Sequence, residues 1–349
     1  MKGNAPAFNV LMDGDEDETI RWRGDPRKTF SDWTIQVASK PSKWNKSAYK
    51  IFCAGTPPLV AIYHVHRNIL AYGARKSLYF ANLFGSEDRF FESKSATSKI
   101  ELEPLATEAF PQLLDFIYSE NPLKIETKTA TALYFLGEYF GVTGVTAQVI
   151  EYCEKDFSVL NARTYYDHAR LFQNDVILDL LAAFVGKNVG YIPPLSSFVK
   201  ATHPPFWAKV ALTYPCDAPE YSLIVAANIA HHKADLDLAT FRELVDEEKV
   251  PCIHPLAALR LCDVQDKLQK ASAESSDGSQ DGFYCSSCDS ETISFQERCA
   301  SALSRAWLTY AISESEVELL HQRNSSFLTD LLVKYQLQSK EELERVNEM

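Results

Sequence analysis

Glycine is scarce in this chain of 349 residues: there are 13 glycines, and no two are adjacent. The glycine-rich patterns that cradle phosphate groups, G-x-x-x-x-G-K and G-x-G-x-x-G, are missing. The nucleophile pattern G-x-S-x-G and the zinc pattern H-E-x-x-H are missing too. Since no other acid–base or nucleophile constellation stands out, the sequence predicts a protein that is not an enzyme and has no cofactor.

Basic charge is also in deficit. The chain has 35 Lys and Arg against 47 Asp and Glu, a formal net charge of -12, and its basic residues are dispersed. Such a chain repels both the phosphate backbone of nucleic acids and an anionic lipid surface. We therefore expect neither a nucleic-acid nor a membrane partner.

Long apolar runs are missing as well. No run reaches the roughly 20 residues that span a bilayer, and the first residues lack the apolar core of a secretory signal. We therefore expect a cytoplasmic or nuclear chain. In a reducing compartment its eight cysteines would be free thiols, most of them in apolar stretches.

Two short motifs have the spacing of partial metal sites. Cys285 and Cys288 form a C-x-x-C, and His64 and His66 stand two positions apart. A structural zinc site needs four ligands, and neither motif has a second pair. We interpret the cysteines as an incidental pair in an acidic, Ser-rich segment and the histidines as structural residues at the start of a helix, so no metal site is predicted.

The beginning of the chain combines an acidic arm with strand-like segments. Residues 1–28 are polar and carry an acidic cluster, which predicts a flexible arm, although Phe8–Met12 could pair as a short strand. Apolar and polar residues alternate over 32–37, which predicts a strand. Residues 49–54 are predicted to pair with it as a hairpin.

Helical patterns take over from His64 onward. A short strand is predicted at 99–102, followed by amphipathic helices at 105–118, 129–140 and 145–157. Further helices are predicted at 161–172, 174–186, 195–201, 206–213, 220–232, 238–246 and 255–269.

These patterns predict an α+β fold built from an α/β domain followed by an all-α region. The predicted divisions are the arm at 1–28, the α/β domain at 29–157, the helical domain at 158–270, an acidic Ser-rich linker at 271–291 and a pair of helices at 292–349.

Four blocks between Asp32 and Asp156 resemble the BTB/POZ family. S-D-W-T-I-Q-V is similar to the family's first strand, and Y-H-V-H-R-N-I-L-A-Y-G-A-R-K-S-L-Y-F-A-N-L-F to its H-R-x-V-L-A-A-x-S-x-Y-F block. K-I-E-L-E-P-L-A-T-E-A-F-P-Q-L-L-D-F-I-Y-S is similar to its I-x-L…F-I-Y-T-G block, and residues 133–153 fit the helices that follow. The chain departs from the pattern by an extra Ala-Arg between Gly73 and Ser77, and by Glu120-Asn121 in place of a glycine.

The residues that follow resemble a BACK domain. Leu160–Ala169 is similar to its L-x-x-x-N-x-x-x-x-x-x-x-A start, and 252–268 is similar to the helix that closes such regions. Kelch repeats, common beyond a BACK domain, are absent, because the chain has no Gly-Gly doublet and no room for their blades.

The BTB/POZ resemblance implies a homodimer formed through the first helix, often with an exchanged N-terminal strand, for which Phe8–Met12 is the candidate. Asp32 and Arg67 match a pair that lines a charged pocket near the dimer seam, and we expect this pair to be buried. Many relatives bind cullin-3 through a hydrophobic-x-Glu element. Phe90 and Glu92 stand at the matching place, although Phe90 and its neighbour could instead cap the domain core.

The resemblance therefore implies a protein-interaction adaptor that brings an unknown protein substrate to a cullin-3 ubiquitin ligase. The alternative is an oligomerisation, signalling or transcription-related scaffold without ubiquitin transfer. The absence of catalytic motifs fits both.

Overall fold

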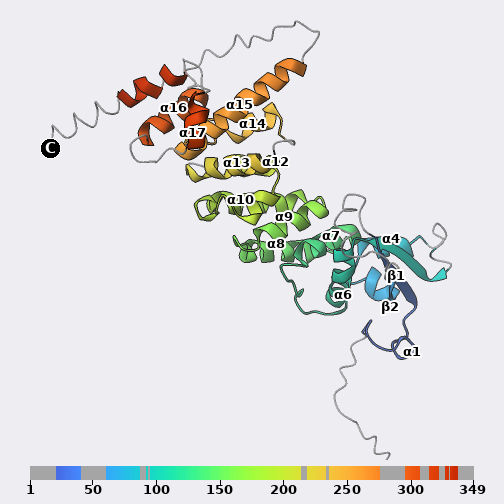
Figure 1. Cartoon of the computed structure of the whole chain (residues 1–349). Coiled ribbons are helices and arrows are strands. Elements are labelled where there is room, and N and C mark those ends of the chain that lie inside the picture. The colour runs from blue at the N-terminus through green and yellow to red at the C-terminus, as the bar shows by residue number, and fades with distance from the viewer. Residues whose placement is uncertain are drawn as a thin grey trace, which may run out of the picture. The chain divides into compact units, whose positions relative to one another are not determined.

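The computed structural model describes residues 21–40, 60–86, 92, 95–213, 218–232, 236–275, 295–306, 314–321, 327–329 and 331–336. The chain divides into two compact units, Met1–Val149 and Ile150–Met349. The first unit mixes strands with helices and the second is helical (Figure 1), which confirms the predicted α+β class. Within the described ranges, no helix is both long enough and apolar enough to cross a membrane.

The sheet of the first unit has three strands in the order β2-β1-β3. Its middle strand, β1 (Trp33–Ser39), pairs antiparallel with β2 (Val60–Val65) and parallel with β3 (Thr97–Leu102). Successive side chains of a strand point to opposite faces, and Trp33, Ile35 and Val37 occupy the buried face of β1, as their alternation predicts.

The partner of β1 differs from the prediction. Residues 49–54, predicted to form the hairpin strand, lie outside the described residues, while β2 was not predicted at all. The reason is that β2 is almost continuously apolar: Val60 and Ile62 are exposed and Tyr63 and Val65 are buried, so the sequence shows no alternation. His64 therefore lies in a strand, not at the start of a helix as predicted.

Helices α3 (Arg67–Ala71), α4 (Leu78–Phe84), α6 (Pro104–Tyr118) and α7 (Ala130–Phe140) complete the fold of the first unit, and α8 (Val145–Asp156) crosses into the second. The rings of Phe80 and Phe110 both pack against Phe140, with centroids 5.6 and 5.5 Å apart. Aromatic pairs at such distances add to the stabilisation that burial provides. The helices predicted at 105–118, 129–140 and 145–157 are confirmed to within one residue at each end.

Residues 21–28 fall inside the predicted flexible arm, but in the structure they have a defined place. Helix α1 (Pro26–Thr29) begins after Asp25, whose side chain accepts a hydrogen bond from the backbone N–H of Arg27. Before it, Trp22 packs edge-on against Tyr63 of β2, at 5.5 Å, and donates from Nε1 to Asp115 of α6 at 2.9 Å. Contacts with residues so distant in sequence explain why the polar composition of this segment misled the prediction.

The second unit is a succession of helices, in which α10 packs on α9 and α12, and α15 on α13, α14 and α16. Its elements are α9 (Ala162–Leu171), α10 (Asp175–Lys187), the 3-10 turn η2 (Val189–Tyr191), α11 (Ser197–Ala201), α12 (Pro204–Thr213), α13 (Glu220–His231), α14 (Leu238–Leu244), α15 (Pro255–Ser275), α16 (Phe295–Ala306) and α17 (Glu314–His321). Helix α15 extends past residue 271, where the linker was predicted to begin.

Candidate functional site

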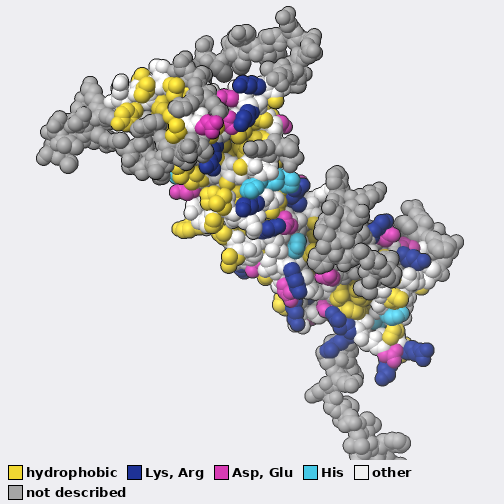
Figure 2. Space-filling model, in the orientation of Figure 1, with side chains coloured by type: hydrophobic (Ala, Val, Ile, Leu, Met, Phe, Trp, Pro, Cys, Tyr) yellow, Lys and Arg dark blue, Asp and Glu magenta, His cyan; other side chains and the backbone are white. Residues whose placement is uncertain are grey.

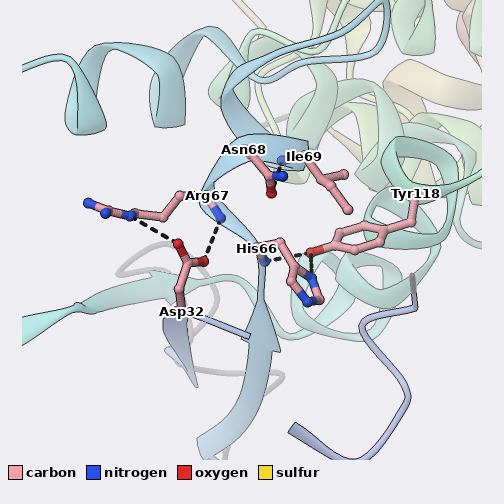
Figure 3. A network of polar contacts seen from close by, with 6 residues as sticks. All are labelled: Asp32, His66, Arg67, Asn68, Ile69 and Tyr118. Atoms are coloured by element: carbon pink, nitrogen blue, oxygen red, sulfur yellow. Dashed lines mark hydrogen bonds and ion pairs between the residues drawn. The ribbon is translucent and has the colours of Figure 1, made fainter. Parts of the chain in front are cut away.

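The start of α3 brings together the two residues that the family resemblance singles out. Asp32 accepts a hydrogen bond from the backbone N–H of Arg67 at 2.9 Å, and a second from its guanidinium Nε at 3.3 Å. One carboxylate thus caps the first turn of α3 and pairs with the side chain of the same residue. Figure 3 shows Asp32 next to the N-terminal end of this helix.

This pair is half exposed within one chain, and its predicted place near a dimer seam stays a prediction. The side chains of Arg67 and Asp32 retain 40% and 48% of their accessible surface. The cause is the position of Arg67 at the first residue of a surface helix, where its guanidinium lies over the rings of Trp33 and Phe84 at 5.8 and 5.9 Å. An exposed ion pair contributes little to stability.

His66 points away from Arg67, and its hydrogen bonds hold the N-terminal end of α3 in place. Its Nε2 lies 2.6 Å from the carbonyl oxygen of Thr29, and its Nδ1 lies 3.1 Å from the hydroxyl of Tyr118. Because a carbonyl can only accept, Nε2 carries the proton of the neutral ring, and Nδ1 accepts from the tyrosine hydroxyl. That hydroxyl accepts in turn from the backbone N–H of His66 at 2.7 Å. Figure 3 shows His66 and Arg67 pointing in opposite directions.

We expect Tyr118→Phe to lower the free energy of unfolding by about 1–3 kcal/mol, because two partly buried groups of His66 lose their partner. Burial also raises the pKa of Tyr118 above its usual value. Since unfolded tyrosine ionises near pH 10 and the folded residue holds its proton longer, the wild-type protein should lose stability as the pH rises above about 10.

Urea unfolding at neutral and alkaline pH measures both effects. Tyr139→Phe is the matched control, because Tyr139 is exposed and no hydrogen bond of its hydroxyl is seen among the described residues. Equal midpoints for Tyr118→Phe and the wild type would contradict the assigned network.

Arg75 was not predicted as a site residue, yet it organises the adjoining turn. Its guanidinium donates to four backbone carbonyl oxygens at and beyond the end of α6. They belong to Phe116 (3.1 Å), Ser119, Glu120 (2.9 Å) and Asn121 (2.7 Å). Arg75 comes from the Ala-Arg that is extra to the family pattern, and Glu120-Asn121 replaces the family's glycine. The two departures from the family pattern therefore lie in contact. Arg75 caps the end of α6, where the family's glycine is missing.

The negative charge of Glu92 acts on Tyr79, which belongs to an aromatic surface formed by α4 and α7. Tyr79 stacks on the exposed ring of Tyr139, with centroids 6.0 Å apart, and Phe135 adjoins Tyr139 at 5.8 Å. The pKa of Tyr79 is raised to about 12, mainly by burial and further by the negative charge of Glu92. An acidic side chain thus stands beside half-exposed tyrosines, a composition typical of interface hot spots.

Most of the remaining predicted residues lie where the structure gives no description. Phe90, the Phe8–Met12 strand and the cysteine pair at 285 and 288 lie outside the described residues. His66 is buried, whereas His64 in β2 is half-buried. In the part of the chain that the structure describes, no three His, Cys, Asp or Glu residues are grouped so as to hold a metal ion.

Comparison with protein families gives one match. The model of the BTB/POZ domain matches residues 60–157, from the start of β2 to the residue after α8. A search of curated proteins found no protein similar to this chain. The helices from α9 onward lie beyond the matched residues.

Proposed function

Residues 60–157 of this chain form a BTB/POZ domain, and on this premise we propose that the protein is a dimeric adaptor for a cullin-3 ubiquitin ligase. BTB/POZ domains are interaction modules that commonly homodimerise. In this proposal the domain holds the second copy and the cullin scaffold, and the helical unit, which we propose is BACK-like, holds the substrate. The adaptor acts in the cytoplasm or nucleus and has no enzymatic activity of its own.

Exposed apolar side chains near α3 support dimerisation at this end of the domain. Phe30 is 85% exposed and has a positive φ of 56°, and Tyr72 is 76% exposed. Exposed large apolar side chains are typical of interaction surfaces, and in a two-fold dimer the same surface of both copies meets itself. The half-exposed Asp32–Arg67 pair adds charges of both signs, which are self-complementary across a two-fold axis. Helix α1 is only four residues long, so α3 and its surroundings carry this proposal instead.

The position of Glu92 is the observation that carries the cullin-3 proposal. Its charge acts on Tyr79, and Tyr79 stacks on Tyr139, so the acid of the hydrophobic-x-Glu element borders an aromatic surface. Tyrosine supplies a large contact area at low conformational cost. A cullin helix with apolar and basic side chains would find complementary groups here.

We expect the full-length dimer to capture cullin-3 in a pull-down, and Glu92→Ala and Tyr139→Ala each to weaken capture about tenfold. Glu108→Ala is the matched control, because Glu108 is an exposed acid on α6. Light scattering should give twice the 39.3 kDa of one chain for each variant.

Two results would contradict the proposal. The first is a dimer that does not bind cullin-3, which would leave the oligomerisation scaffold as the function. The second is capture by Glu92→Ala that equals capture by Glu108→Ala.

A further inference from the structure

One stretch of the helical unit reverses the charge balance of the chain. Residues 180–216 contain no Asp or Glu, although the whole chain has 47 of them, and they contain Lys187, Lys200 and Lys209. Of these lysines, Lys209 is paired with Asp179 of α10 at 2.6 Å. Lys187 and Lys200 form no ion pair with any other residue that the structure describes. The loop between α10 and α11 is therefore flanked by two lysines for which the described residues supply no acidic partner.

The same loop presents two large apolar side chains to solvent. Tyr191 is 80% exposed and Leu195 is 73% exposed. Their neighbours Val189, Ile192 and Phe198 are buried. Since the loop already anchors itself through these three residues, the exposure of Tyr191 and Leu195 leaves them available to another molecule. Figure 2 shows hydrophobic side chains at the surface of the helical unit near α10 and α13, with Lys, Arg and His side chains beside them.

Backbone hydrogen bonds hold this loop in one conformation. The N–H of Tyr191 donates to the carbonyl of Asn188 at 2.9 Å, which closes η2. The N–H of Ser196 donates to the carbonyl of Pro193 at 2.9 Å, which closes a β-turn with Leu195 in its third position. A binding loop that is ordered in advance loses little conformational entropy when a partner arrives.

Lys187, Tyr191, Leu195 and Lys200 lie close to one another along the chain. A 3-10 turn rises about 2 Å per residue, which places Lys187 within about 8 Å of Tyr191 along the backbone. Lys200 lies in α11, which begins two residues after Leu195. Helix α11 is held against α13 by His232, whose Nε2 donates to the carbonyl of Lys200 at 2.9 Å. We name the group Lys187, Tyr191, Leu195 and Lys200 the lysine-flanked loop.

We propose that the lysine-flanked loop binds the substrate of the adaptor, and that this substrate presents an acidic peptide segment with a bulky apolar residue at its centre. This inference rests on the proposed function. The apolar residue of the peptide packs between Tyr191 and Leu195, and the carboxylates on either side pair with Lys187 and Lys200.

Charge complementarity selects this class of partner. A basic peptide would be drawn to the rest of a chain with net charge -12, but the lysine-flanked loop repels it. An uncharged apolar peptide would leave both lysines without partners at the edge of a buried contact. Only a segment that combines acidic and apolar residues satisfies all four side chains.

The test is fluorescence anisotropy of the full-length protein with a labelled peptide, S-D-E-D-L-F-E-D-E-S. We expect binding that weakens with added salt. The charge reversal Lys187→Glu with Lys200→Glu, and separately Tyr191→Ser with Leu195→Ser, should each weaken binding at least tenfold. Lys270→Glu and Leu332→Ser are the matched controls, since both residues are exposed elsewhere in the helical unit, and they should leave binding unchanged.

Equal binding by the charge-reversed variant and the wild type, or no binding up to about 1 mM peptide, would overturn the inference. A variant that neutralises Asp277, Asp281, Asp289 and Glu291 tests whether the chain's own acidic segment is the occupant instead. Tenfold tighter peptide binding by this variant would also overturn it. The capture of cullin-3 does not involve the peptide. A protein that binds the peptide but does not capture cullin-3 would therefore contradict only the proposed function.

Discussion

Replacing Arg75 with alanine should lower the free energy of unfolding of the BTB/POZ domain by about 2–3 kcal/mol. The guanidinium donates to the carbonyls of Phe116, Ser119, Glu120 and Asn121, and it lies 4.1 Å from the centre of the Phe116 ring. Its positive charge also stands at the negative end of the α6 dipole. Removing it leaves the end of a 15-residue helix without a cap.

Hydrogen exchange of residues 104–121, together with urea unfolding, measures this loss where it occurs. Arg75→Lys keeps the charge without the planar fork of donors, so it should recover part of the stability. Lys76→Ala is the control, because Lys76 is the exposed neighbour. If the amide hydrogens of α6 exchanged at the same rate in Arg75→Ala and in Lys76→Ala, the capping role of Arg75 would be contradicted.

Asn228→Ala should destabilise the helical unit by about 3–4 kcal/mol, the largest effect that we expect from one substitution. Asn228 is 1% exposed, and its Nδ2 donates to the carbonyls of Val199 at 2.7 Å and Thr202 at 2.6 Å. Alanine would leave a small cavity in the interior and remove this donor from both carbonyls, of which that of Val199 keeps a hydrogen bond from the hydroxyl of Thr202 at 3.2 Å. Asn228→Asp should be at least as harmful, because a carboxylate would face two acceptors unless it took up a proton.

Asn188→Ala is the reference substitution with which the loss of stability in Asn228→Ala is compared. Asn188 donates to the single carbonyl of Phe184 at 2.8 Å in a half-buried place, so its removal should cost about 1 kcal/mol. Exchange protection of α11 and α13 reports the Asn228 substitution, and that of α10 reports the Asn188 substitution. A smaller loss for Asn228→Ala than for Asn188→Ala would refute the ranking. Since α11 carries Lys200, Asn228→Ala should also loosen one side of the lysine-flanked loop.

Local patterns predicted the helices well, because the apolar face of a helix is formed by residues that lie close together in the sequence. Helix α10 shows this: Ile177, Leu181 and Val185 recur every four positions and all are buried. Helix α15 was predicted too short, because Lys270, Ala271 and Ser272 are exposed and do not continue its apolar face. Strand β2 was missed, because both of its faces are apolar.

The candidate site was predicted in part. The resemblance to a family located Asp32, Arg67 and Glu92, and the structure places Asp32 and Arg67 in contact as an ion pair that is half exposed within one chain. Arg75 and Asn228 could not be predicted, since each acts on backbone carbonyls that are distant in sequence. The extra Ala-Arg next to an absent glycine was the one signal that could have pointed to Arg75.

The position of β1 in the middle of its sheet has a consequence for how the protein folds during synthesis. Its parallel partner β3 joins it across a long connection, and the Nε1 of Trp33 finds its acceptor, Ser98, 65 positions further along the chain. Pairings between such distant residues form slowly, because loop-closure entropy opposes them. On the ribosome, one edge of β1 therefore stays open until β3 has left the exit tunnel. During that interval the apolar strand depends on β2 alone, or on a chaperone, for protection from aggregation.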